Sequence, residues 1–284
     1  MLQGLSSAAA VRRGQANLYH SCLEKILAPL ASYGETGIAM ASGDGIWRRC
    51  HPIVAVFAGD YPKQLLITGT FKGQCPKCLV PSNQLGEYHN FPLRDNKLAK
   101  NLYRGADGDF RVFQAACRHA GLKPIYHPFW ESLTLTNIFV SITPDILHQG
   151  LQGIVKHVVM WITMAFGPRH IDTRCRSLPP NHHIKTFANG ISHLSRISGQ
   201  EHKDMCQILL SLVLDLRLPG GHSTLRLIGC VRALLNFLYL TQLPSHTTDT
   251  ISCMNESLSQ FHENKSIFVD LGICNDFNLP KVAL

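Results

Sequence analysis

The sequence lacks an uninterrupted apolar stretch long enough to cross a membrane. Its two most apolar segments, residues 151–167 and 224–241, are both interrupted by charged side chains. A spanning helix needs about 20 predominantly apolar residues, and charges near its middle are costly. We therefore expect two buried helices and no membrane partner. The N-terminal "MLQGLSSAAAVRRGQ" also lacks the long apolar core of a signal peptide.

Acidic residues are scarce relative to basic ones. The chain has 19 Asp and Glu against 27 Lys and Arg, which gives a formal charge of +8 and a pI near 9.0. This balance permits a polyanionic partner such as nucleic acid but does not require one. With 284 residues, 45% of them hydrophobic, the chain can bury a substantial core in one large or two smaller domains.

Closely spaced cysteines are also few. Of ten cysteines only Cys75 and Cys78 form a close pair, in "CPKC", and the scattered remainder does not suggest a secreted disulfide framework. We expect a reduced, intracellular protein. Two thiolates at this spacing can share one Zn²⁺, act as a redox dithiol, or be a chance pair. Zinc needs four ligands, and the "NHH" at 181–183 is either a partner or a solvated loop.

Strand signals are concentrated before residue 90 and scarce after it. A helix over 15–33 is expected to bury a face containing Leu18, Cys22, Ile26, Leu27 and Leu30. A hairpin turning at Asp44-Gly45 follows. The run "IVAVFAGD" then predicts a short strand buried on both faces. Helical patterns follow at 96–121, 145–166, 200–217, 224–241 and 251–264.

These patterns predict an α-rich α/β protein with a composition boundary near residue 90. Residues 1–90 would form a partial α/β portion with the Cys-x-x-Cys element. Residues 91–284 would form a mainly helical region.

Asp60 ends the predicted strand, where open α/β sheets usually place their ligands. A carboxylate there suits Mg²⁺, which prefers oxygen ligands. The alternative is that Asp60 caps a helix beginning at "YPKQLL", with Pro62 in its first turn.

"TPDILHQGLQGIVKHVVMW" begins with a helix start, for which Thr143 is the expected cap. Asp145 and His148 then lie three residues apart on one face. They can share a proton, hold a metal or orient a nucleic-acid backbone, or simply form an acidic first turn. Further on, Ser198 and Glu201 have the spacing of a capping box.

The order of these motifs resembles that of the Plavaka transposases of fungal genomes, which group with CACTA-like and Kyakuja-Dileera-Zisupton elements. The resemblance rests on "GDYP", "CPKC" and "PDILHQ" in that order and on "ISHLSRISGQEHKDM", "VRALLNFLYL" and "FNLPK" after them. It covers essentially the whole chain.

The resemblance implies a DDE-type nuclease with a ribonuclease H-like unit and a large helical insertion. Asp60 would match the second catalytic aspartate, and Asp145 with His148 would match a later C/D-x-x-H motif. Cys75 and Cys78 would match the family's C-x-x-C. In the intact family two Mg²⁺ (or Mn²⁺) ions would activate the attacking oxygen, and structural Zn²⁺ would join the cysteines.

The same resemblance implies transposon-end DNA as the partner and the nucleus as the location. It is also compatible with a homo-oligomer. The family's first aspartate and last glutamate find no convincing match, and the capping-box context of Glu201 speaks against it as the last acid. We therefore expect a central transposase fragment that does not cut DNA alone. The alternatives are a non-catalytic DNA- or protein-binding remnant and a zinc-ribbon-like interaction protein.

Overall fold

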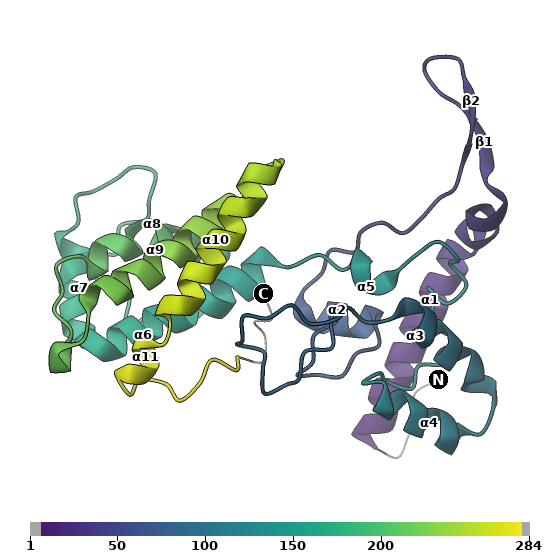
Figure 1. The fold of residues 1–284 in the computed structure, drawn as a ribbon, viewed down its shortest axis with the longest axis horizontal. Coiled ribbons are helices and arrows are strands. Elements are labelled where there is room, and N and C mark those ends of the chain that lie inside the picture. Colours follow the sequence, from purple (N-terminus) through teal and green to yellow (C-terminus); the bar gives the residue numbers. More distant parts are fainter. Residues whose placement is uncertain (1–6, 280–284) are drawn as a thin grey trace. The chain divides into compact units, whose positions relative to one another are not determined.

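The computed structural model describes residues 7–279. Within them helices predominate, and the strands form one two-stranded antiparallel sheet, so the predicted α-rich α/β class is confirmed. The chain divides into two compact units (Figure 1). The first comprises the described residues through Ser82 together with Phe91–Pro144. The second comprises Asn83–Asn90 and the described residues from Asp145 onward.

The first unit packs short helices against one long helix. Its elements in chain order are α1 (Ala8–Thr36), β1 (Ile38–Ala41), β2 (Trp47–Cys50), α2 (Tyr61–Ile67), α3 (Asn96–Tyr103), the 3₁₀ turn η1 (Arg104–Asp107), α4 (Phe110–His119) and α5 (Ile138–Ser141). The helix expected over 96–121 is thus interrupted. Asp109 caps α4 through its side chain, so the "RGADGD" stretch ends one helix and starts another.

The predicted hairpin is confirmed. Ile38 pairs with Cys50 and Ala41 with Trp47 in β1 and β2. Gly45 at the turn has φ +76°, a conformation that favours glycine. The Asp44 carboxylate accepts the backbone N–H of Ile46 at 3.1 Å and pairs with Arg48 at 2.7 Å.

The core of the first unit is centred on Trp130, which is fully buried and donates its indole N–H to the Ile67 carbonyl at 2.8 Å. The predicted inward face of α1 was partly wrong. Leu18 and Ile26 are 57% and 69% exposed, and Cys22 is exposed as well. Leu27 and Leu30 pack against the core as predicted, and they are joined there by Tyr19 and Leu23 from the neighbouring stripe.

The buried strand expected over residues 53–60 is not formed. Ile53 and Val56 are 53% and 63% exposed, and only Phe57 makes a bridge, in the parallel sense, to Ile142. The run is therefore an extended connection that anchors Val54 and Phe57 on the core. A continuous apolar run needs neighbours on both edges to become a central strand.

The second unit is a helical bundle. Its elements are the π-helix η2 (Ile146–Val155), α6 (Lys156–Phe166), α7 (Pro168–Ser177), α8 (Gly199–Val213), the 3₁₀ turn η3 (Pro219–Gly221), α9 (Thr224–Leu240), α10 (Thr248–Asn264) and α11 (Ile267–Asp270). Helices α9 and α10 pack side by side (Figure 1). The two apolar segments of the sequence supply this core through residues such as Val158, Trp161, Val231 and Leu235. No helix in residues 7–279 has the length and apolarity of a membrane span.

Candidate functional site

A parallel pairing within the first unit aligns the segment that leads to Asp60 with the segment that leads to Asp145. The Phe57 N–H donates to the Ser141 carbonyl at 2.7 Å, and the Thr143 N–H donates to the Phe57 carbonyl at 3.2 Å. Phe57 and Ile142 are the bridged pair. Because the pairing is parallel, the two segments run in the same direction where they are bridged.

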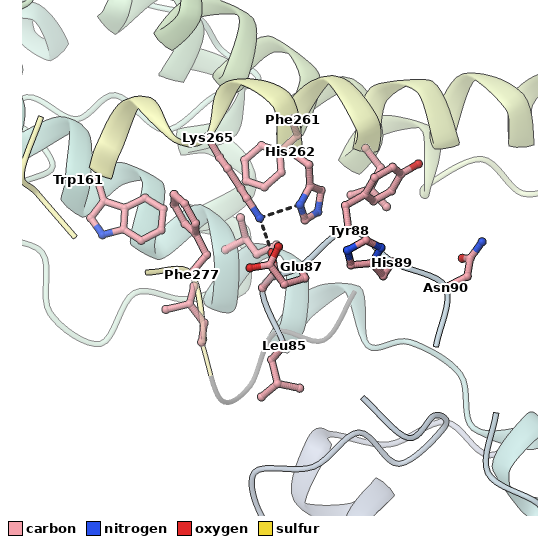
Figure 2. A pocket seen from close by; sticks show the side chains of 14 residues that line it. Leu85, Glu87, Tyr88, His89, Asn90, Trp161, Phe261, His262, Lys265 and Phe277 are labelled. Carbon is pink, nitrogen blue, oxygen red and sulfur yellow. Dashed lines mark hydrogen bonds between the residues drawn. The ribbon is translucent and has the colours of Figure 1, made fainter. Parts of the chain in front are cut away.

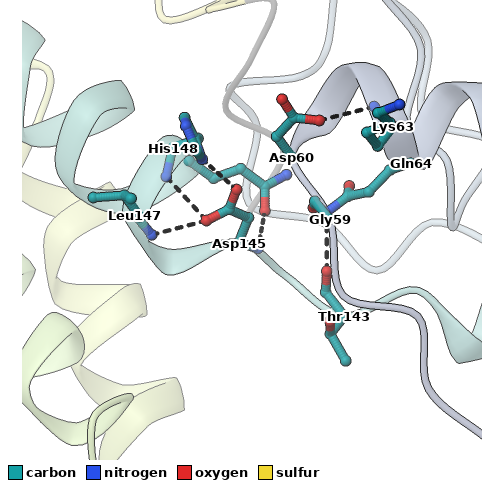
Figure 3. Close-up of polar contacts among 9 residues, drawn as sticks. Gly59, Asp60, Lys63, Gln64, Thr143, Asp145, Leu147 and His148 are labelled. Atoms are coloured by element: carbon teal, nitrogen blue, oxygen red, sulfur yellow. Dashed lines mark hydrogen bonds and ion pairs between the residues drawn. The ribbon is translucent and has the colours of Figure 1, made fainter. Parts of the chain in front are cut away.

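Gln64 holds the two segments at this point. Its side chain is 1% exposed, and Nε2 donates to the Gly59 carbonyl at 2.8 Å and to the Thr143 carbonyl at 3.0 Å (Figure 3). Both amide hydrogens are thus satisfied, as a buried polar group requires. Sequence reasoning missed this role; the available signal was one polar residue in the otherwise apolar "QLLI".

Asp60 is the N-cap of α2. Its Oδ1 accepts the backbone N–H of Lys63 at 3.0 Å, and Pro62 lies in the first turn, so the helix-capping interpretation is confirmed. Within the described residues, the capping hydrogen bond engages Oδ1 and leaves Oδ2 available (Figure 3). Asp60 can therefore cap the helix and still offer one oxygen to a cation.

Asp145 and His148 belong to the second unit and contact each other. Asp145, and not Thr143, is the N-cap of the following helix. Its Oδ1 accepts the N–H groups of Leu147 and His148 at 3.0 and 3.1 Å, and its Oδ2 lies 2.5 Å from His148 Nδ1 (Figure 3). The helix that they begin is a π-helix, a rare form that occurs frequently at functional sites.

Cys75 and Cys78 lie in a turn held against residues 92–94. Cys78 bridges to Leu93, and the Arg94 side chain donates through Nε to the Cys75 carbonyl at 2.9 Å. A hydrogen bond from the Cys78 thiol lowers the pKa of Cys75 to about 6, and the Lys77 N–H, 3.4 Å from Cys75 Sγ, acts in the same direction. The same contact raises the pKa of Cys78. One thiolate is thus favoured over two.

No group of three His, Cys, Asp or Glu side chains that could hold an ion occurs within residues 7–279. Glu201 already interacts with Ser198 and Lys185. It completes the capping box of α8 with Ser198, as predicted, and its Oε1 lies 2.5 Å from the Lys185 amine. These contacts, Lys185 first, lower the pKa of Glu201 to about 2.

Comparison with known proteins assigns the class. The family model described as Plavaka transposase matches residues 2–162, more than half of the chain. The matched span contains Asp60, the two cysteines of "CPKC", Asp145 and His148. The chain is therefore transposase-derived. It belongs to the Plavaka transposase family, as its motif order predicted. Neither a curated protein nor a solved structure matched it.

Proposed function

We propose that this chain is a nuclear, DNA-binding member of the Plavaka family that does not cut DNA by itself. Membership of a transposase family over the span that carries all the candidate site residues supports this proposal. The family also implies a ribonuclease H-like unit around residues 37–80, and the isolated parallel bridge of Phe57 to Ile142 is the described feature that comes nearest to such strand pairing. The partner would be the duplex DNA of transposon ends.

Asp60 is proposed as the carboxylate of the DDE pattern that the chain retains. Its Oδ2 is the oxygen available to Mg²⁺ or Mn²⁺. Both oxygens of Asp145 accept hydrogen bonds inside its own helix. Of this pair, His148 is therefore the residue that can contact a ligand, through its second ring nitrogen, Nε2. Two ions close together need several carboxylates to offset their mutual repulsion. The described residues do not fit a two-metal centre, and we derive no cleavage step through one.

Cys75 and Cys78 are proposed as two of the four ligands of a zinc site. No further His, Cys, Asp or Glu joins them in a group of three among the described residues; this favours weak binding, because a structural zinc site takes four ligands. Purified protein should therefore contain clearly less than one zinc per chain. Tight stoichiometric zinc would require further ligands.

Nicking of supercoiled plasmid tests the absence of cleavage. The wild-type chain is incubated with plasmid and Mg²⁺ or Mn²⁺ beside Asp60→Ala and Glu201→Ala variants. We expect no metal-dependent nicking from any of the three. Nicking by the wild type that both substitutions abolish would contradict the proposal, since it would show a complete carboxylate set within this chain.

A further inference from the structure

The second unit contains a cavity of about 230 Å³, and none of the candidate site residues lines it. Its walls come from the 85–90 segment, from η2 and α6, from α10 with the following Lys265, and from Phe277 and Leu279 (Figure 2). All of these belong to the second unit. The volume is below the roughly 300–1,000 Å³ of pockets for drug-sized ligands, so the cavity suits a single ring system.

A glycine and a buried lysine build the cavity. A Cβ on Gly86 would lie 2.4 Å from the Phe277 carbonyl oxygen, so only glycine lets the two segments approach this closely. Lys265 is 8% exposed and donates to the Gly86 carbonyl. Its amine also donates to His262 Nδ1 at 2.7 Å (Figure 2). The 85–90 segment is thereby fixed over α10.

Aromatic side chains dominate the lining. Tyr88 and His262 are stacked with ring centroids 5.0 Å apart and planes at 26°. The Phe277 ring lies under the Lys265 amine at 4.8 Å and meets Trp161 edge-on at 5.7 Å. Tyr88 is 46% exposed, so its ring is accessible from solvent. A flat, polarizable ligand would find stacking partners here.

The charge of the cavity favours a neutral ligand over an anionic one. The Lys265 amine is already engaged by a carbonyl, an imidazole nitrogen and a ring. Burial lowers the pKa of His262 to about 4, so the imidazole is neutral at pH 7. Glu87 adds a carboxylate at the rim. Among the described lining residues a phosphate would meet no Lys or Arg other than the engaged Lys265, whereas the edge of a base could pair with polar groups of the rim.

We propose that this cavity receives one unpaired nucleobase of bound DNA, stacked against the Tyr88–His262 pair. This inference rests on the proposed DNA-binding function. The formal charge of +8 is complementary to a DNA partner rather than to an apolar peptide side chain. Enzymes and binding proteins that take a base out of the stack hold it in this way, with aromatic rings on its face and polar groups at its edge.

The test compares two fluorescent DNA hairpins that differ at one unpaired nucleotide. In one the nucleotide carries a base; in the other it is abasic. We expect the wild-type chain to bind the base-bearing hairpin about tenfold more tightly, as base–aromatic stacking allows. Tyr88→Ala should remove this preference and Tyr88→Phe should keep it. Tyr239→Ala is the matched control, because Tyr239 is 43% exposed in the same unit and lies outside the cavity lining.

The outcomes separate the two proposals. Equal affinity of the wild type for both hairpins would overturn the base pocket while leaving DNA binding intact. A preference that survives Tyr88→Ala in a folded variant would also overturn it. Failure to bind either hairpin would overturn the proposed function on which the pocket rests. The wild-type comparison needs no variant, so it can overturn the base pocket even if Tyr88→Ala fails to fold.

Discussion

Nδ1 of His148 lies 2.5 Å from Oδ2 of Asp145, three residues earlier in the chain. The other carboxylate oxygen accepts two backbone N–H groups of the same helix start. Both oxygens of Asp145 are therefore occupied locally. The contact fixes the imidazole through Nδ1 and leaves Nε2 without a hydrogen-bond partner among the described residues. The pair thus presents an oriented histidine rather than a free carboxylate.

The helix-capping role of Asp60 can be tested by two substitutions. Asp60→Ala should lower the free energy of unfolding by about 1 kcal/mol, because it removes the side chain that caps α2. Asp60→Asn should leave it nearly unchanged, since asparagine caps as well as aspartate. Urea unfolding measures both. Equal destabilisation by the two would mean that the charge itself stabilises the fold.

Stability should fall as the solution is acidified from pH 7 to pH 5. Burial lowers the pKa of His20 from 6.5 to about 4, so between these values the unfolded chain binds a proton that the folded chain does not. The contribution is therefore complete above about pH 6.5 and is lost as the pH falls toward 4, at up to about 1.4 kcal/mol per pH unit. His20→Gln should reduce this slope. An unchanged slope would show that His20 takes up its proton without unfolding.

The Cys75 thiolate should form at unusually low pH. Its pKa is lowered to about 6 chiefly by the hydrogen bond from Cys78. Cys78→Ala removes that donor and should raise the pKa of Cys75 toward the ordinary value of about 8.5. Ultraviolet absorbance of the thiolate against pH measures the change. Cys253→Ala is the control, because Cys253 is a single exposed thiol. A curve unaltered by Cys78→Ala would refute the pairing.

We predict that helix α7 contacts the DNA backbone. Arg169 and Arg176, seven residues apart, are exposed on it, whereas its acid Asp172 is buried and accepts the Ile191 and Ser192 N–H groups. Replacing both arginines by alanine should reduce the salt slope of DNA binding by about 2. Arg226→Ala should not, because Arg226 is paired with Asp270 at 2.7 Å. An equal reduction of the salt slope by Arg226→Ala would show that helix α7 has no special part in contacting the DNA backbone.

Local signals in the sequence predicted local structure well. The turn at Asp44-Gly45, the capping box of Ser198 and Glu201, and the Asp60 cap all formed. Each depends on residues within four positions of one another. Periodicity also located the long helices of the second unit, because their apolar faces are continuous.

Features that depend on distant partners could not be predicted in the same way. Helix α1 carries two adjacent apolar stripes, and only the core decided that Leu23 rather than Cys22 packs inward. Burial of Gln64 between Gly59 and Thr143 depends on a contact 79 residues away in sequence. The approach of Gly86 to Phe277 is of the same kind. No pattern of neighbouring residues predicts any of these three contacts.

The salt dependence of duplex DNA binding tests the account most directly. Fluorescence anisotropy of a labelled duplex, repeated over a series of salt concentrations, gives the slope of log affinity against log salt concentration. We predict binding with a steep negative slope, close to −0.9 for each phosphate contacted. An affinity that does not change with salt, or no binding at low salt, would contradict a DNA-binding role and favour a protein-binding remnant of a transposase.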